Sequence, residues 1–196
     1  MSGIHRTLGR IGRVLRCLRR DRSGVAFVEL ALVAPTLVLL YCGAYVVSDL
    51  VTCGRKVSLT AKTVTDLTTR YATVSSTDLT SIMSNSKLVL APYSTSNATM
   101  RVSELQITDA SHASVVWSQA QNATALTTGT IVTLPTNFAP TEMQPNTTTS
   151  TVGAYIVMGE VGYTYTPLFG GTILPSPTLY NRYFMLPRLT TQVAHQ

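Results

Sequence analysis

The chain has 196 residues, of which 45% are hydrophobic and 12% are charged, and its formal net charge is +6. All of that excess lies in residues 1–24, which hold seven arginines and one acidic residue, Asp21. Residues 25–196 hold eight basic and eight acidic residues. The overall charge therefore gives no reason to expect a nucleic-acid-binding face on the part that folds.

Residues 1–24 are predicted to form a basic leader with an apolar helical stripe. The apolar residues of the stripe are spaced by three or four: Ile4, Leu8, Ile11, Leu15 and Leu18. Such a leader can lie on a membrane and present a cleavage site, and a mitochondrial presequence is also Arg-rich and acid-poor. A secretory signal peptide cleaved near Cys42 is a third alternative, which would require an unusually long apolar core.

Residues 25–51 are predicted to form a transmembrane helix. From Val25 to Val47 the only ionisable carboxylate or base is Glu29, and this stretch gives a helix of roughly 34 Å, enough to cross a bilayer core. Because the arginines precede the helix, the positive-inside rule predicts that the leader stays in the cytoplasm and that residues 52–196 are exported.

Glu29 is a candidate functional residue, since intramembrane carboxylates are rare and costly. Cleavage after Gly24 would make Val25 the new amino terminus and Glu29 the fifth residue of the mature chain. An ammonium and a carboxylate one helical turn apart, or on neighbouring subunits, neutralise each other in low dielectric. The alternative is that Glu29 marks only the edge of an ordinary anchor.

Residues 23–35, SGVAFVELALVAP, resemble the start of type IV prepilins and, among these, the TadE-like pseudopilins of the tight-adherence (Tad or Flp) pilus. A second similarity covers residues 159–168, GEVGYTYTPL, and 186–188, LPR. The resemblance implies cleavage between Gly24 and Val25 by a prepilin peptidase, with Glu29 as the assembly carboxylate. It also implies a bacterial inner-membrane protein with its carboxyl-terminal domain in the periplasm.

Pro35 lies within the apolar segment and predicts a helix kink. Proline removes one amide donor and crowds the carbonyl of Ala31, which leaves a backbone acceptor free. In a pilus-like assembly the bend would help subunits to pack, whereas in a simple anchor it would be a plain membrane kink.

Residues 52–196 are predicted to form an α+β domain of pilin-like type. The helical spacing continues from the membrane to about Tyr71, with Gly54 as a candidate interruption, and a second helix begins at an N-cap near Ser76 and ends near Ser86. Strands are expected at 99–108, 114–119 and 152–166, in antiparallel pairing because no crossover-length helix separates them.

Residues 120–151 are predicted to be a Thr-rich exposed loop with a short edge strand at 131–134. Tyr163 and Tyr165 are expected to share one strand face. The candidate core residues of the domain are Val102, Leu105, Ile107, Val116, Trp117, Ile156, Val161, Tyr163 and Leu168.

Catalytic and metal-binding motifs are missing from the sequence. His5, His112 and His195 are scattered, and no hydrolase, P-loop or Cys-x-x-Cys pattern accompanies them. Cys42 and Cys53 would lie about 16 Å apart on a continuous helix, too far for a disulfide. We therefore expect no enzyme activity, no metal and no cofactor, with an anchored enzyme as the least favoured alternative.

The sequence favours a minor pilin or pseudopilin that acts in assembly of a Tad-type adhesive pilus. The partners expected from the resemblance are the prepilin peptidase, other pilins or pseudopilins, and the inner-membrane assembly platform. The main alternative is a permanently anchored periplasmic binding or scaffold domain that does not enter a filament. Both alternatives need the same anchor, so the sequence does not separate them.

Overall fold

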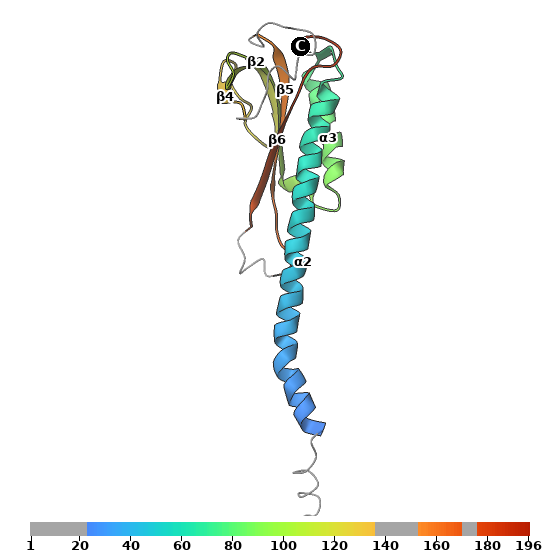
Figure 1. Cartoon of the computed structure of the whole chain (residues 1–196). Coiled ribbons are helices and arrows are strands. Elements are labelled where there is room, and N and C mark those ends of the chain that lie inside the picture. The colour runs from blue at the N-terminus through green and yellow to red at the C-terminus, as the bar shows by residue number, and fades with distance from the viewer. Residues whose placement is uncertain (1–22, 136–152, 170–175) are drawn as a thin grey trace, which may run out of the picture. The chain divides into compact units, whose positions relative to one another are not determined.

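The computed structural model describes residues 23–135, 153–169 and 176–196 (Figure 1). The chain divides into two compact units, Met1–Val47 and Ser48–Gln196. The predicted α+β class is confirmed, because a long apolar helix is followed by an antiparallel sheet. Residues 1–22 of the predicted leader and residues 136–151 of the predicted Thr-rich loop, which are half of that loop, lie outside the described residues.

The long helix, α2, spans Ser23–Thr68 and contains Pro35. It passes through Gly54 unbroken, so the candidate interruption there is wrong, and it ends three residues before Tyr71. A glycine costs a helix about 1 kcal/mol relative to alanine. Cys53 and Val57, which flank Gly54, are buried in the core, and this packing holds the helix together at the glycine.

The main sheet has five strands in the order β4-β3-β2-β5-β6, and all four pairings are antiparallel. The three long predicted strands are confirmed with shifted ends, and the island at 131–134 forms the edge strand β4. Strand β6, at the other edge, was not predicted. The strands are β2 (Ala98–Ile107), β3 (His112–Gln121), β4 (Ile131–Thr133), β5 (Tyr155–Thr164) and β6 (Thr178–Met185).

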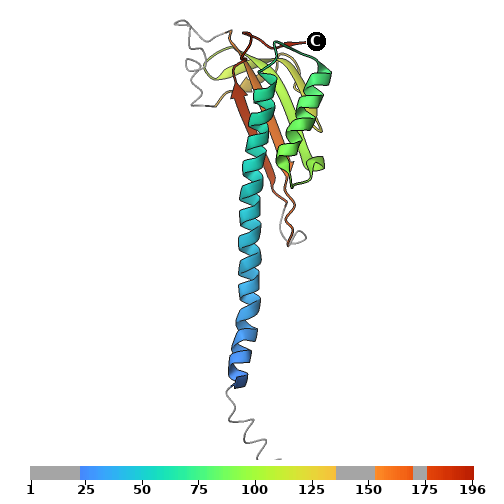
Figure 2. The same ribbon diagram turned by 90° about the vertical axis from the view of Figure 1, so that its right-hand side faces the viewer.

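A second helix, α3 (Ser76–Ser86), lies beside α2 in both views (Figures 1 and 2). Its N-cap is Ser75, one residue before the predicted position. Ser75 and Asp78 form a capping box, in which the Ser75 hydroxyl accepts from the Asp78 amide and the Asp78 carboxylate accepts from the Ser75 amide. Two short 3-10 helices, η1 (Lys87–Leu90) and η2 (Thr95–Asn97), then lead into β2.

Two short strands pair outside the main sheet. β1 (Thr73–Val74) and β7 (Ala194–His195) run parallel to each other, unlike the antiparallel pairing expected throughout. This pairing brings the last residues of the chain to the segment that follows α2.

Both faces of the main sheet are buried. One face packs against α2 and α3 through a cluster that includes Val57, Val64, Leu79, Met83, Met100, Val102, Val161, Tyr163 and Tyr165. The other face carries Leu105, Ile107, Ala113, Val115, Leu134, Ile156 and Met158.

Most of the predicted core residues are buried in these two clusters. Val116 is only half-buried, because the β2–β3 register shifts beside it, between Glu104 and Leu105. Leu168 was wrongly predicted: its side chain is 72% exposed, because β5 ends at Thr164 and the chain then leaves the sheet.

Candidate functional site

The amino-terminal part of α2 carries the predicted cleavage, assembly and anchoring residues. It contains a segment long and apolar enough to cross a membrane, none of which is buried, and a signal sequence would have the same properties. Its exposed large apolar side chains are Val25, Phe27, Val28, Leu30, Leu32, Val33, Leu37, Val38, Leu39, Leu40, Tyr41, Tyr45 and Val47.

All four predicted site residues of this segment belong to α2. At Gly24 an added Cβ would meet nothing within 4 Å, and the Val25 side chain is 63% exposed. Glu29 is also exposed and lies one helical turn beyond Val25, so both residues occupy the same side of the helix. Pro35 lies inside the helix. The roles of these residues in cleavage, assembly and bending stay predictions.

The second part of α2, from Ser48 onwards, packs closely on the sheet at Gly159 of β5. A Cβ at this position would lie 2.1 Å from Thr65 Oγ1 and 3.2 Å from the carbonyl oxygen of Ala61. Only a glycine allows the helix and the strand to approach so closely. Gly159 is the first residue of the segment 159–168 that was singled out in the sequence.

Asp49 of α2 binds two tyrosines from distant parts of the chain. The Tyr93 hydroxyl donates to Asp49 Oδ1 at 2.7 Å, and the Tyr165 hydroxyl donates to Asp49 Oδ2 at 2.6 Å. Burial, together with the hydrogen bond to Asp49, raises the pKa of Tyr93 well above its usual range, so the phenol stays a neutral donor. Tyr163 and Tyr165 are both buried on the same side of the sheet, as predicted.

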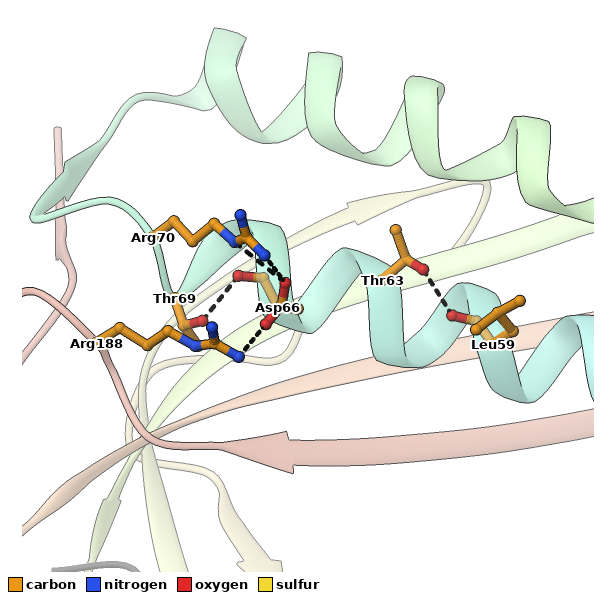
Figure 3. Close-up of polar contacts among 6 residues, drawn as sticks. All are labelled: Leu59, Thr63, Asp66, Thr69, Arg70 and Arg188. Carbon is orange, nitrogen blue, oxygen red and sulfur yellow. Dashed lines mark hydrogen bonds and ion pairs between the residues drawn. The ribbon is translucent and has the colours of Figure 1, made fainter.

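Asp66, near the other end of α2, binds two arginines (Figure 3). Arg70 Nη2 lies 2.6 Å from Asp66 Oδ2, and Arg188 pairs with Oδ1. The Arg188 amide also donates to the carbonyl of Thr69 at 3.0 Å. Both arginines are more than half exposed, so these ion pairs position the carboxyl-terminal segment and contribute little stability.

Glu104 is a fully buried carboxyl group beneath the carboxyl-terminal segment. It accepts hydrogen bonds from the Val193 amide at 2.6 Å and from Trp117 Nε1 at 2.9 Å. Burial raises the pKa of Glu104 to about 7, against the lowering effect of these donors. The Trp117 ring stacks on His195 with 5.3 Å between ring centroids. No local sequence pattern indicates this cluster, because Glu104 and Val193 lie far apart in the chain.

A small cavity of about 80 Å³ lies beside an ion pair between β2 and β5, on the sheet face away from α2. Arg101 Nε lies 2.5 Å from Glu160 Oε2, and the Tyr180 hydroxyl donates to the same carboxylate. The charges in this cavity are therefore already paired with each other.

The predicted histidines and cysteines are not brought together. His112 pairs with Asp109 at the surface, and Cys42 and Cys53 are free thiols; His5 and Cys17 lie outside the described residues. Among residues 23–135, 153–169 and 176–196, no three His, Cys, Asp or Glu side chains are grouped to hold a metal ion. Comparison of the chain with protein-family models, curated proteins and solved structures found no match.

Proposed function

We propose that this chain is a minor pilin or pseudopilin of the TadE-like kind, which acts in assembly of a tight-adherence pilus. The observation that carries the proposal is α2: its first part is apolar, exposed and holds Glu29, and its second part packs on a small antiparallel sheet. In this proposal residues 25–51 cross the bacterial inner membrane, the leader is cytoplasmic, and residues 52–196 are periplasmic.

The contacts of the second motif support the proposal. Gly159 lies against Ala61 and Thr65, the Tyr165 hydroxyl binds Asp49, and Arg188 binds Asp66. Each part of the motif thus contacts α2. Gly159, Tyr165 and Arg188 belong to the second segment of resemblance to TadE-like proteins. In this proposal they hold the sheet against α2.

Processing would turn the amino-terminal part of α2 into an assembly element. Cleavage after Gly24 removes every residue of the basic leader and leaves an ammonium group on Val25. That group can pair with Glu29 of its own helix or of a neighbouring subunit, where low dielectric strengthens the attraction. The exposed apolar side chains then supply the surface on which helices of other pilins pack. The proposed partners are these pilins, the prepilin peptidase and the assembly platform.

Amino-terminal sequencing of the protein recovered from membranes tests the proposal. The proposal expects a mature chain that begins at Val25. The variant Gly24→Asp should accumulate a precursor larger by the leader, whereas Ser23→Ala should be processed normally. If Met1 or Ser2 remains on the functional membrane form, the alternative of a permanently anchored periplasmic domain replaces the pilin proposal.

A further inference from the structure

Strand β6 forms one edge of the main sheet and turns part of its backbone outward. The Tyr165 amide donates to the Pro177 carbonyl at 3.0 Å, which continues the β5–β6 register. Because the bonded positions of an antiparallel pair recur at every second residue, Asn181 points its backbone groups toward β5, and Tyr180 and Arg182 point theirs away from the sheet. In the part of the chain that the structure describes, no strand lies beyond β6.

This edge lacks most of the features that keep sheet edges from pairing with other chains. Such features include a very short strand, a proline and a bulge. β6 has eight residues, contains no proline and pairs with β5 in one unbroken register, whereas β4 at the opposite edge has three residues. Charge is the remaining device, so a strand of opposite charge would find the backbone of β6 open.

α2 brings cations to one face of this edge. Asn181 Nδ2 donates to Ser58 Oγ at 2.7 Å, which places the helix beside β6 (Figures 1 and 2). One turn further along, Lys62 Nζ lies 5.9 Å from the centroid of the Tyr183 ring. Arg55 precedes Lys62 by seven residues, about two turns, and therefore lies on the same side of the helix. The Arg55 and Lys62 side chains are both exposed.

Arg182 supplies a cation on the other face, because neighbouring residues of a strand point to opposite sides. It is exposed, and its guanidinium carbon lies 5.6 Å from the centroid of the Phe184 ring. The acidic residues nearby are already bound: Glu160 pairs with Arg101, and Asp66 with two other arginines. Within the described ranges, none of the three cations at this edge has an ion-pair partner. The edge is thus both open and positively charged.

We propose that β6 accepts an extended acidic segment of another protein as an additional strand. Backbone hydrogen bonds to Tyr180 and Arg182 supply affinity, and acidic side chains next to Arg182 on one face and Lys62 on the other select the partner. A second copy of this chain fits less well, because pairing through β6 would bring the cations of both copies together. The proposal does not depend on the role of the apolar part of α2.

Binding of two synthetic peptides to the full chain in detergent tests the proposal. Both peptides are as long as β6 and consist of threonine and valine around a central pair of residues, which are glutamates in one peptide and lysines in the other. Adjacent side chains point to opposite faces of a strand, so the glutamates can reach both sets of cations. Fluorescence anisotropy of the labelled peptides at low ionic strength should show binding of the glutamate peptide alone.

Charge reversal at the edge should change this preference. Arg182→Glu should weaken binding of the glutamate peptide about tenfold or more and admit the lysine peptide. Lys62→Glu is a second variant, which acts on the other face and should have the same effect. Lys87→Glu is the matched control, because it changes the net charge equally but lies in η1, between α3 and β2, and should bind as the unchanged chain does. Trp117 fluorescence checks that each variant is folded.

Amide hydrogen exchange distinguishes strand addition from simple attraction between charges. With the glutamate peptide bound, the Tyr180 and Arg182 amides should exchange more slowly, while the Asn181 amide, already bonded to β5, should change little. No binding of the glutamate peptide, equal binding of both peptides, or binding without this protection would overturn the proposal. Protection of the same amides that rises with protein concentration in the absence of peptide would also overturn it, because the occupant would then be a second copy.

Discussion

The Tyr165 hydroxyl donates to Asp49 Oδ2 at 2.6 Å and so joins the end of β5 to a helix position 116 residues earlier. The Tyr93 hydroxyl donates a hydrogen bond to the other carboxylate oxygen, Asp49 Oδ1. Asp49 lies near the end of the apolar segment, where an unpaired carboxylate would be costly to cover with protein. The two phenols satisfy it without introducing a second charge.

Removing both phenolic hydroxyls should destabilise the domain. Hydrogen bonds to a charged group contribute about 1.5–3 kcal/mol each, so Tyr93→Phe and Tyr165→Phe should each lower the free energy of unfolding by an amount in this range. Tyr71→Phe, at an exposed position, should change it little. Urea unfolding of the full chain in detergent, followed by Trp117 fluorescence, measures the difference. Equal midpoints for all three variants would contradict a role for Asp49 as an anchor.

Alanine substitutions at Gly159 and Gly54 should change the free energy of unfolding in opposite directions. Gly159→Ala places a Cβ against Thr65 Oγ1, which is itself bonded to the Ala61 carbonyl at 2.7 Å, and should cost about 1–3 kcal/mol. Gly54→Ala meets nothing within 4 Å inside α2 and should gain up to about 1 kcal/mol. The same unfolding assay compares them, and a stabilising Gly159→Ala would mean that helix and strand do not touch there.

Stability should fall as the pH rises through the titration range of Glu104. The pKa of this carboxyl group is about 7 in the folded chain against an ordinary value of 4.5. Between these values the folded state holds a proton that the unfolded state has lost, so the free energy of unfolding decreases with pH and levels off above 7. The expected loss is on the order of 3 kcal/mol. Glu104→Gln should flatten this slope, and an unchanged slope would refute the assignment.

Glu29→Gln should separate membrane insertion from pilus assembly. The apolar segment persists in this variant, so the protein should remain resistant to carbonate extraction, while the charge complementary to the Val25 ammonium is gone. Pilus formation, scored by electron microscopy and surface attachment, should therefore fall. Glu29→Asp keeps the charge and should retain more of the activity. Normal piliation in Glu29→Gln would favour the permanently anchored alternative.

Elements with a strong local pattern could be predicted from the sequence. The apolar run of α2 and the Val- and Ile-rich strands each carry their own signal, and the N-cap of α3 was predicted within one residue. Strand β6 does not, because its exposed edge position admits Asn181 and Arg182 among the apolar residues. Leu168 was misplaced for a related reason: it continues the apolar character of β5, but the strand ends before it.

The contacts of the candidate site could not be predicted. Asp49 and Tyr165, Asp66 and Arg188, and Glu104 and Val193 are pairs of residues from distant parts of the chain. Nothing in the local sequence identifies the partner of a carboxylate when that partner is supplied by tertiary folding. The requirement for a glycine at position 159 could not be predicted either, because it arises from the close approach of Thr65 on α2.

The pairing of β7 with β1 makes folding of the domain depend on residues near its carboxyl end. Val193 covers Glu104 and Trp117, and the adjacent strand closes on Thr73–Val74. A translation product that stops before Val193 would leave a buried carboxyl group and an indole open to water. Closure of the domain over Glu104 and Trp117 therefore requires Val193, which the chain supplies only after the whole sheet has been synthesised.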